Sequence, residues 1–215
     1  LDVSLLEKAT QVHAEMNSSR KKILVVKSTV TPGTCAKLNE TTPHHVLYNP
    51  EFLTQRTHTK DFLNPHDVII GYDGRNQKSI QAGSKLQDLY RDFFLYYGLG
   101  VPPINHSVYE VVEIVKMMRN SFYATKISFM NGIYHMCQEL DVPYSNTADL
   151  ATAYGEHPWI APTHMEVPGP DGKLEWGGKC FPKDTQALVN SAKELGVDLE
   201  VLKAAIDQRN KIRDE

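Results

Sequence analysis

Short apolar runs alternate with amphipathic stretches through the first half of the chain. Three of these runs are short and continuously apolar, which is typical of strands buried on both faces of a parallel sheet: residues 23–26, 46–48 and 68–71. The stretches that predict helices are residues 2–17, a short segment after the Pro32-Gly33 break, and residues 77–96. Alternating helices and buried strands predict a doubly wound α/β sheet.

The pattern changes after Pro102-Pro103, where strand-like runs stop. Residues 109–140 place apolar residues at helical spacing over an unusual length. The remaining predicted elements are a helix at about 146–154, a Gly/Pro-rich loop at 155–179, and helices at about 182–195 and 198–213. The sequence therefore predicts an α/β half followed by an all-α half, with the boundary near residue 105.

The α/β half lacks the usual opening of a dinucleotide-binding sheet. Such a sheet begins with a strand, a G-x-G-x-x-G turn and a helix. No G-x-G-x-x-G occurs in the sequence, and Gly71-x-x-Gly74 has the wrong spacing. We therefore expect the chain to enter such a sheet halfway, which would leave an unpaired strand edge.

Composition narrows the function classes. The 215 residues are 41% hydrophobic and 23% charged, which is typical of a globular protein, and the formal net charge of −3 argues against nucleic acid or an anionic membrane as the main partner. No run is long enough for a membrane span, and no signal peptide is evident. Three cysteines at unrelated spacings favour reduced thiols in a cytoplasmic protein, and nine histidines form no metal-binding pattern, so no metal is expected.

The segment GGKCFPKDT, residues 177–185, combines a cysteine with features of a helix start. Pro182 suits the first turn of a helix, so Cys180 is predicted at or just before a helix N-terminus, where partial positive charge favours a thiolate. Lys179 and Lys183 act in the same direction. A nucleophilic cysteine is one interpretation, but a buried inert cysteine is the commoner outcome for such a pattern.

Lys116 and Asn120 stand four residues apart in the long predicted helix and so share one face. A lysine and an amide that converge on one oxygen can stabilise a developing alkoxide. The alternative is an ordinary solvated pair. The flanking residues are apolar, however, and a polar pair within a core-facing run needs partners.

Two polar loops follow predicted strands. They are KSTVTPGT (27–34) and NPEFL (49–53), and both lie at the carboxyl edge, where open α/β sheets bind ligands. Each alone is compatible with a plain turn, because Pro-Gly and Asn-Pro are turn pairs. Two such loops on one edge, with Glu51 available, make a cleft the better interpretation.

Four segments together resemble the UDP-glucose/GDP-mannose dehydrogenase family, in the family's order and over nearly the whole chain. They are KSTVTPGT (27–34), YNPEFLT (48–54), EIVKMMRNSFYATKISFMN (113–131) and GGKCFPKDTQAL (177–188). The most specific is GGxCFPKD, and the tract 164–180 looks like a subgroup with an extended loop. The resemblance implies the second half of a Rossmann-like parallel sheet in residues 1–105 and a helical central domain, which dimerises and carries the cysteine, in residues 106–215.

The resemblance also implies a reaction. The C6 alcohol of a nucleotide sugar is oxidised to the uronic acid with NAD as cofactor, by way of a thiohemiacetal and a thioester on the cysteine. UDP-glucose is the default substrate, and GDP-mannose and UDP-N-acetyl sugars remain open. A homodimer through the 109–140 helix is expected.

Matched residue by residue, the resemblance assigns roles within the site. Cys180 is the nucleophile, and Lys116 and Asn120 hold the substrate oxygen. Asp184 and Glu51 look like the carboxylates that activate water or handle protons, with Thr29 near the catalytic water. The residues expected to contact the cofactor are Thr29, Glu51 and Lys183. The residues expected to contact the substrate are Phe52, Leu53, Lys116, Asn120 and Gly177.

The sequence departs from the family pattern in several places. The nucleotide fingerprint is absent, the chain begins at Leu1 without Met, and it stops at Glu215, where the family continues into a second α/β domain. Gln55 stands where the family commonly has a glutamate, and Trp159 where an arginine commonly reaches the neighbouring subunit. Glutamine cannot act as a base, and tryptophan cannot pair with phosphate. We expect a fragment that binds NAD weakly and turns over poorly alone.

Two other classes of function compete. The first is a non-catalytic dimerisation or regulatory remnant, which Gln55 and Trp159 favour. Five intact residues oppose it: Cys180, Lys116, Asn120, Asp184 and Glu51. A cysteine hydrolase would pair Cys180 with His164 or His157, but nothing in the sequence locates an oxyanion hole or an orienting third group. Thiol-dependent esterase activity without NAD would support it.

Overall fold

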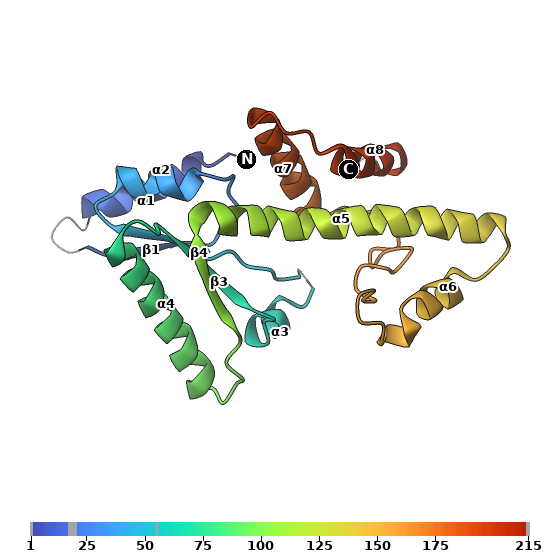
Figure 1. Cartoon of the computed structure of the whole chain (residues 1–215), viewed down its shortest axis with the longest axis horizontal. Coiled ribbons are helices and arrows are strands. Elements are labelled where there is room, and N and C mark those ends of the chain that lie inside the picture. Colours follow the sequence, from blue (N-terminus) through green and yellow to red (C-terminus); the bar gives the residue numbers. More distant parts are fainter. Residues whose placement is uncertain (1, 17–20, 55, 214–215) are drawn as a thin grey trace. The chain divides into compact units, whose positions relative to one another are not determined.

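The computed structural model describes residues 2–16, 21–54 and 56–213. Its contacts divide the chain into two units, one up to Lys116 and one from Met117, and each is described by itself (Figure 1). The elements, in chain order, are α1 (Ser4–Met16), β1 (Ile23–Val26), α2 (Thr34–Thr41), β2 (His45–Tyr48), α3 (His58–Leu63), β3 (Val68–Tyr72), α4 (Gln77–Tyr96), β4 (Ile104–Val108), α5 (Tyr109–Glu139), α6 (Tyr144–Ala151), η1 (Ala153–Gly155), α7 (Phe181–Glu194) and α8 (Glu200–Ile212).

The first unit is built on a four-stranded sheet in the order β1-β2-β3-β4. β1 pairs in parallel with β2, and β3 with β4. β2 and β3 are antiparallel and meet only at Tyr48 and Gly71. The predicted strands and the α/β architecture are confirmed, although the sheet is mixed rather than wholly parallel. The expectation that the run 23–26 is buried on both faces is wrong, because β1 lies at the edge of the sheet and exposes Ile23 and Val25. An antiparallel pair needs no helical crossover, and the connection between these strands carries only the six-residue α3.

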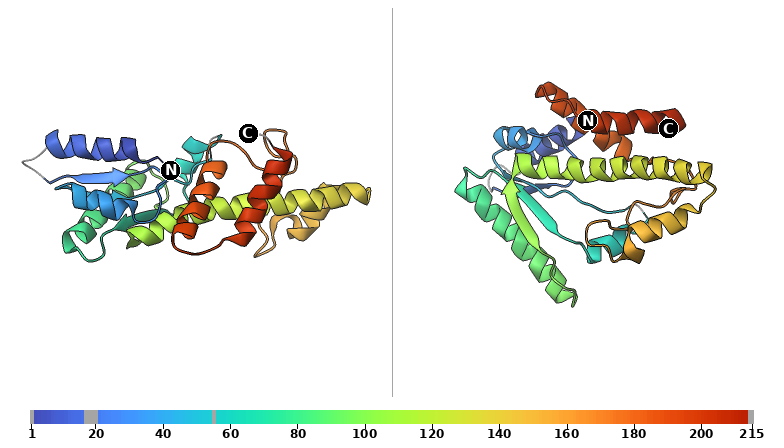
Figure 2. Two further views of the ribbon diagram at one scale, coloured as in Figure 1. Left: turned by 90° about the horizontal axis from the view of Figure 1, so that it is seen from above. Right: turned by 45° about the vertical axis from the view of Figure 1, so that its right-hand side comes forward.

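Alternate residues of the central strands point to opposite faces of the sheet and bury two separate cores. One core lies under α1, α2 and the start of α5, and its sheet residues are Val26, Val46, Tyr48 and Ile69. The other lies under α4 and is formed by Leu47, Val68, Ile70, Ala82 and Leu86. Figures 1 and 2 show α4 on the opposite side of the sheet from α1 and α2.

The start of α5 is fixed to the sheet directly after β4. The Tyr109 hydroxyl donates to the Val46 carbonyl over 2.6 Å. A Cβ on Gly71 would lie 3.2 Å from Val112 Cγ2, so the glycine lets the helix approach the sheet closely. β4 was not among the predicted strands, and it spans the proposed boundary at residue 105. The division into residues 1–105 and 106–215 stays a prediction.

The second unit contains the rest of α5, α6, η1, α7 and α8. The predicted 146–154 helix is divided into α6 and the 3-10 turn η1, whose Tyr154 has φ 55°. The long loop that follows is fixed to α5 by Lys126, whose Nζ donates to the carbonyls of Ala161 and Thr163 over 2.6 and 2.7 Å. Within the described ranges, no helix combines the length and apolar character needed to cross a membrane.

Candidate active site

The first unit brings Glu51, Phe52 and Lys116 together at the carboxyl end of β2. Lys116 is only 3% exposed, and its Nζ donates to the Glu51 carbonyl over 2.6 Å and lies 3.6 Å from Glu51 Oε1. It also lies 5.1 Å from the centre of the Phe52 ring. The Leu53 N–H donates to Glu51 Oε2 over 2.7 Å. A buried ammonium needs such compensation, so the solvated alternative for Lys116 is wrong.

Lys27, Asn49 and Tyr90 form a second polar cluster in this unit, which the sequence did not single out. Lys27 Nζ donates to Asn49 Oδ1 over 2.8 Å and to the Tyr90 hydroxyl over 3.2 Å, while that hydroxyl donates to Asn49 Oδ1 over 2.6 Å. Asn49 Nδ2 donates to the Ile69 carbonyl, which fixes the amide. Burial lowers the pKa of Lys27, Glu51 opposes the shift, and Lys116 adds to it.

Thr29 lies half-buried in the loop between β1 and α2. That loop is held from α5, because both oxygens of the fully buried Glu113 accept backbone N–H groups at the start of α2. The distances are 2.6 Å from Gly33 and 2.8 Å from Cys35. Glu113 thus supplies a remote cap for a helix whose own N-cap, Gly33, has no side chain.

In the second unit, Cys180 is the N-cap of α7, and Pro182 lies in the first turn. Both features match the prediction from the sequence. Cys180 is exposed, whereas Cys35 and Cys137 are buried. The expectation of a buried Cys180 is therefore wrong, and its role as a nucleophile stays a prediction.

Asp184, in the first turn of α7, is 1% exposed, and its carboxylate accepts hydrogen bonds from two side chains. Asn120 Nδ2 donates to its Oδ2 over 2.5 Å, and Lys183 Nζ donates to its Oδ1 over 2.6 Å. Its own N–H donates to the Cys180 carbonyl over 2.9 Å. Three of the predicted residues, Asn120, Lys183 and Asp184, are thus joined directly, and Asn120 stands one turn after Lys116 on α5.

Gly177 lies against the guanidinium of Arg213. A Cβ at Gly177 would lie 2.6 Å from Arg213 Cζ. Arg213 is 6% exposed and is held by the Glu175 carbonyl and by Asp171. The close approach explains the glycine structurally, and the predicted contact between Gly177 and substrate stays a prediction.

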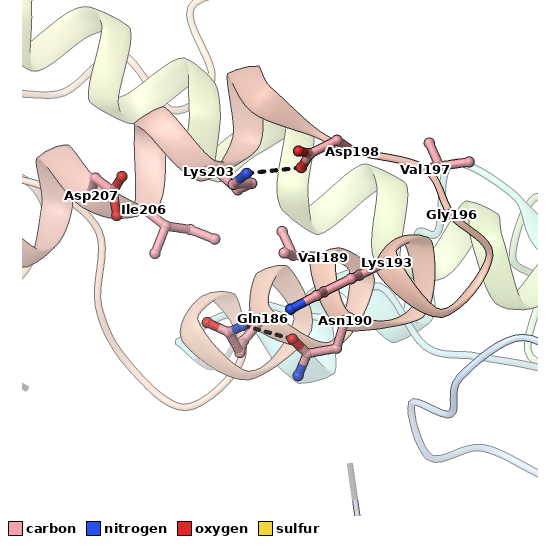
Figure 3. Close-up of a pocket in the computed structure, with 10 residues that line it drawn as sticks. All are labelled: Gln186, Val189, Asn190, Lys193, Gly196, Val197, Asp198, Lys203, Ile206 and Asp207. Atoms are coloured by element: carbon pink, nitrogen blue, oxygen red, sulfur yellow. Dashed lines mark hydrogen bonds and ion pairs between the residues drawn. The ribbon is translucent and has the colours of Figure 1, made fainter.

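A groove of about 530 Å³ lies between α7 and α8 (Figure 3). It is lined by Gln186, Val189, Asn190, Lys193, Gly196, Val197, Asp198, Lys203, Ile206 and Asp207. Of its two lysines, Lys203 is already paired with Asp198 over 2.8 Å, and Gln186 donates to Asn190 over 3.0 Å. None of the predicted site residues lines it, so it does not mark the chemistry.

The histidines offered for a hydrolase have other roles in the second unit. His157 Nδ1 accepts the N–H groups of Trp159 and Ile160 over 3.3 and 3.1 Å. His164 stacks on Tyr123 at 4.1 Å, and burial, aided by Lys126, lowers its pKa. Trp159 is 88% exposed, and Gln55 lies outside the described residues. In residues 2–16, 21–54 and 56–213, no cluster of His, Cys, Asp or Glu could hold a metal.

Comparison with known protein families identifies the family of the chain. Residues 1–94 match the NAD binding domain of the UDP-glucose/GDP-mannose dehydrogenase family, and residues 110–211 match its central domain. The chain belongs to this family. The resemblance inferred from the four segments is confirmed.

Curated relatives in the family are longer than this chain. UDP-glucose 6-dehydrogenase of Rickettsia conorii is 31% identical over 191 residues, which cover 86% of this chain and 39% of the relative. UDP-glucose 6-dehydrogenase TuaD of Bacillus subtilis is 30% identical over 201 residues, which cover 89% of this chain and again 39% of the relative. The chain therefore spans well under half the length of these dehydrogenases.

Solved structures of the family share the fold. A UDP-glucose dehydrogenase from Pyrobaculum islandicum has a TM-score of 0.80 and 28% identity and covers 98% of this chain and 46% of its own. A GDP-mannose dehydrogenase from Pseudomonas aeruginosa has a TM-score of 0.62 and 26% identity and covers 99% of this chain and 48% of its own. The Rossmann-like sheet with a long central helix is thus the family fold.

NAD is the cofactor that the family's N-terminal domain binds. The donors that follow β1 fit part of a dinucleotide, since Lys27, Ser28 and Thr29 supply a cation and two hydroxyl groups at the carboxyl edge of the sheet. An ammonium has three protons, and the cluster with Asn49 and Tyr90 uses two of them. The phosphate-binding G-x-G-x-x-G turn is not in the sequence, so these residues account for only one part of a cofactor site.

Proposed function

We propose that this chain forms the catalytic core of an NAD-dependent nucleotide-sugar 6-dehydrogenase, which oxidises a C6 alcohol to a uronic acid. UDP-glucose is the first substrate to test. The observation that carries the proposal is the exposed Cys180 at the N-terminus of α7, one turn before a buried Asp184 that is held by Asn120 and Lys183. A thiol at a helix N-terminus suits nucleophilic catalysis because the partial positive charge there favours the thiolate, and a fixed carboxylate one turn later is available to handle a proton.

In the first oxidation, Lys116 and Asn120 bind the C6 oxygen and stabilise the negative charge that develops on it. NAD, when bound, accepts the hydride that leaves C6. The alcohol proton passes to a neighbouring carboxylate, for which Asp184 and Glu51 are the candidates, with Thr29 beside the water they activate. Phe52 and Leu53 contact the sugar nucleotide, and Lys183 and Glu51 contact the cofactor. The product of this step is an aldehyde.

In the second oxidation, Cys180 Sγ adds to the aldehyde carbon, and the thiol proton moves to the C6 oxygen. The thiohemiacetal then loses a second hydride from C6 and the proton of its hydroxyl group, which leaves a thioester. Water adds to the thioester carbonyl, the carbon–sulfur bond breaks, and the thiol and the uronic acid are released. The overall reaction consumes two oxidised cofactors for each sugar.

A homodimer through α5 is part of the proposal. In the second unit, α5 exposes four large apolar side chains: Met118, Phe122, Phe129 and Met136. Their spacings of four, seven and seven residues place them within about 40° of one another around the helix. Such a narrow seam is self-complementary and suits pairing with the same seam of a second copy.

The test is formation of NADH and a uronic acid from a panel of nucleotide sugars. UDP-glucose, GDP-mannose and UDP-N-acetyl sugars are each incubated with NAD and the chain, and the products are quantified by mass spectrometry. The incubation is long because we propose slow turnover for this chain alone. Cys137→Ala serves as a control that removes a buried thiol instead. Products with the wild type and this control, and none with Cys180→Ala, support the proposal. Absence of product with every sugar favours a non-catalytic member of the family.

A further inference from the structure

The segment that leads into Cys180 is irregular in structure but buried. Glu175 and Trp176 are each 3% exposed and lie in the loop before α7. Buried backbone outside helices and sheets needs hydrogen-bond partners from side chains. Glu175 also has φ 59°, a left-handed conformation that is uncommon for a residue with a side chain. This backbone conformation therefore needs stabilising contacts from other parts of the unit.

Side chains from α5 and the end of α8 satisfy its backbone. The Glu175 N–H donates to Asn131 Oδ1 over 3.0 Å, and Arg213 Nη1 donates to the Glu175 carbonyl over 2.9 Å. Arg209 Nε donates to the Trp176 carbonyl over 3.1 Å, and Arg209 Cζ lies 5.6 Å from the centre of the Trp176 ring. All these residues belong to the second unit.

The Glu175 carboxylate links the same two helices through its oxygens. Ser128 Oγ, on α5, donates to Oε2 over 2.7 Å, and Gln208 Nε2, on α8, donates to Oε1 over 2.7 Å. Trp176 Nε1 in turn donates to Ser128 Oγ over 2.8 Å. Arg213 closes the arrangement by packing on Gly177, three residues before Cys180.

We propose that Glu175 is a positioning residue for Cys180. Its carboxylate fixes the Glu175–Gly177 segment to α5 and α8 and thereby sets where the Gly178–Cys180 turn enters α7. This role rests on the proposed function of Cys180, but the immobilisation itself is a property of the folded chain. A partly satisfied buried polar network is costly, so removing the carboxylate loosens this segment first.

Two substitutions separate the chemistry of Glu175 from its bulk. Glu175→Gln keeps one acceptor for Gln208, and its amide can donate to Ser128 Oγ, whose proton can then turn to the Ala205 carbonyl at 3.3 Å. Glu175→Ala removes both acceptors. Gln208 then keeps only its bond to the Ser128 carbonyl, and the Ser128 hydroxyl keeps only the longer bond to the Ala205 carbonyl. Glu166→Ala removes an exposed carboxylate from the same loop and is the matched control.

The test measures amide hydrogen exchange at the buried residues 175 and 176 and the rate at which iodoacetamide alkylates Cys180. We expect Glu175→Ala to speed this exchange about tenfold or more, which corresponds to the loss of one or two net hydrogen bonds. We also expect it to change the alkylation rate of Cys180. Glu175→Gln and Glu166→Ala should stay within about twofold of the wild type. Exchange in the middle of α7 and α8 should not change.

Unchanged exchange at residues 175 and 176 in Glu175→Ala would overturn the proposal, and so would a uniform rise through α7 and α8, which indicates general destabilisation. If Glu175→Ala does not fold, Gln208→Ala decides, because it removes one donor and should give a smaller but equally local rise. These readouts need neither NAD nor a sugar. In a chain that turns over, Glu175→Ala should lower kcat and leave KM for NAD unchanged, so a failed dehydrogenase assay and a failed positioning role are distinguishable.

Discussion

Asn120 donates from Nδ2 to Asp184 Oδ2 over 2.5 Å, across 64 residues of sequence. With Lys183 on the other oxygen, the carboxylate is oriented by one amide and one cation. The bond also fixes the Asn120 amide, whose second N–H and carbonyl oxygen are then presented in a defined direction. The two residues that the family resemblance assigns to substrate and to proton handling are therefore oriented by each other.

Asp184→Asn tests this relationship. The substitution keeps the size of the side chain but presents a donor to Asn120 or to Lys183, both of which are donors. We expect uronic acid formation to fall by about 10²–10⁴-fold, the range for loss of a general acid or base. Asp207→Asn, on α8 at the groove, is the control and should keep its rate. Full activity of Asp184→Asn would show that this carboxylate only supports the fold.

Gly177→Ala tests whether the glycine serves the fold. The added Cβ would meet the guanidinium of Arg213, which is buried and held on both sides. We expect a loss of about 1–3 kcal/mol in the free energy of unfolding, measured by urea denaturation. Gly132→Ala, where nothing lies within 4 Å of the new Cβ, should be neutral or stabilising. A raised KM for the sugar with unchanged stability would instead assign Gly177 to substrate.

Glu113→Gln tests the remote cap on α2 through its pH dependence. Burial raises the pKa of Glu113, although the N–H groups of Cys35 and Gly33 oppose the rise. A carboxyl group with a higher pKa in the folded state favours folding at low pH, and this contribution is lost as the pH rises through the folded-state pKa. We therefore expect the wild type to lose stability relative to Glu113→Gln as the pH rises from about 4.

Thermal unfolding of both proteins in a series of buffers measures this difference. A gain of wild-type stability over the same pH range would contradict the account. Glu113→Ala, which leaves both backbone N–H groups without an acceptor, should cost roughly 1–3 kcal/mol at every pH.

The pattern of apolar and polar residues along the sequence predicted most of the helices and strands, and each element that it missed has a physical explanation. β1, β2 and β3 were predicted because each is a continuous apolar run. β4, with the sequence INHSV, was missed because it is not fully buried and carries polar residues along its length. The short α3 was missed because no residue of it is buried, so it has no apolar face to reveal it.

The sequence predicted the site only where short-range signals, such as those of a helix start, place a residue. Pro182 placed Cys180 at a helix start, but no local rule pairs Lys116 with Glu51, 65 residues earlier. Glu113 and Gly33 are 80 residues apart in sequence. The family resemblance assigned roles to Lys116 and Glu51, but none to Glu113, although Glu113 begins the quoted segment 113–131. Lys27 and Asn49 lay within quoted motifs and could have been suspected, whereas Tyr90 gave no signal.

The apolar seam on α5 predicts a change in assembly. Replacing Phe122 and Phe129 with serine removes two large side chains, each 66% exposed, so the folded monomer should lose little stability. We expect the wild type to sediment as a dimer and the double variant as a monomer. Val201→Ser, on an exposed position of α8, is the control and should stay dimeric. A wild type that sediments as a monomer at high concentration would contradict the proposed dimer.

The central claim is that Cys180 carries the sugar as a thioester, and trapping that species tests it most directly. The chain is incubated with NAD and UDP-glucose, quenched in acid, digested and examined by mass spectrometry. The account predicts a UDP-glucuronyl adduct on the Cys180 peptide alone, removed by hydroxylamine as the hydroxamate, and no adduct in Cys180→Ala. Uronic acid formation that persists in Cys180→Ala would contradict the account.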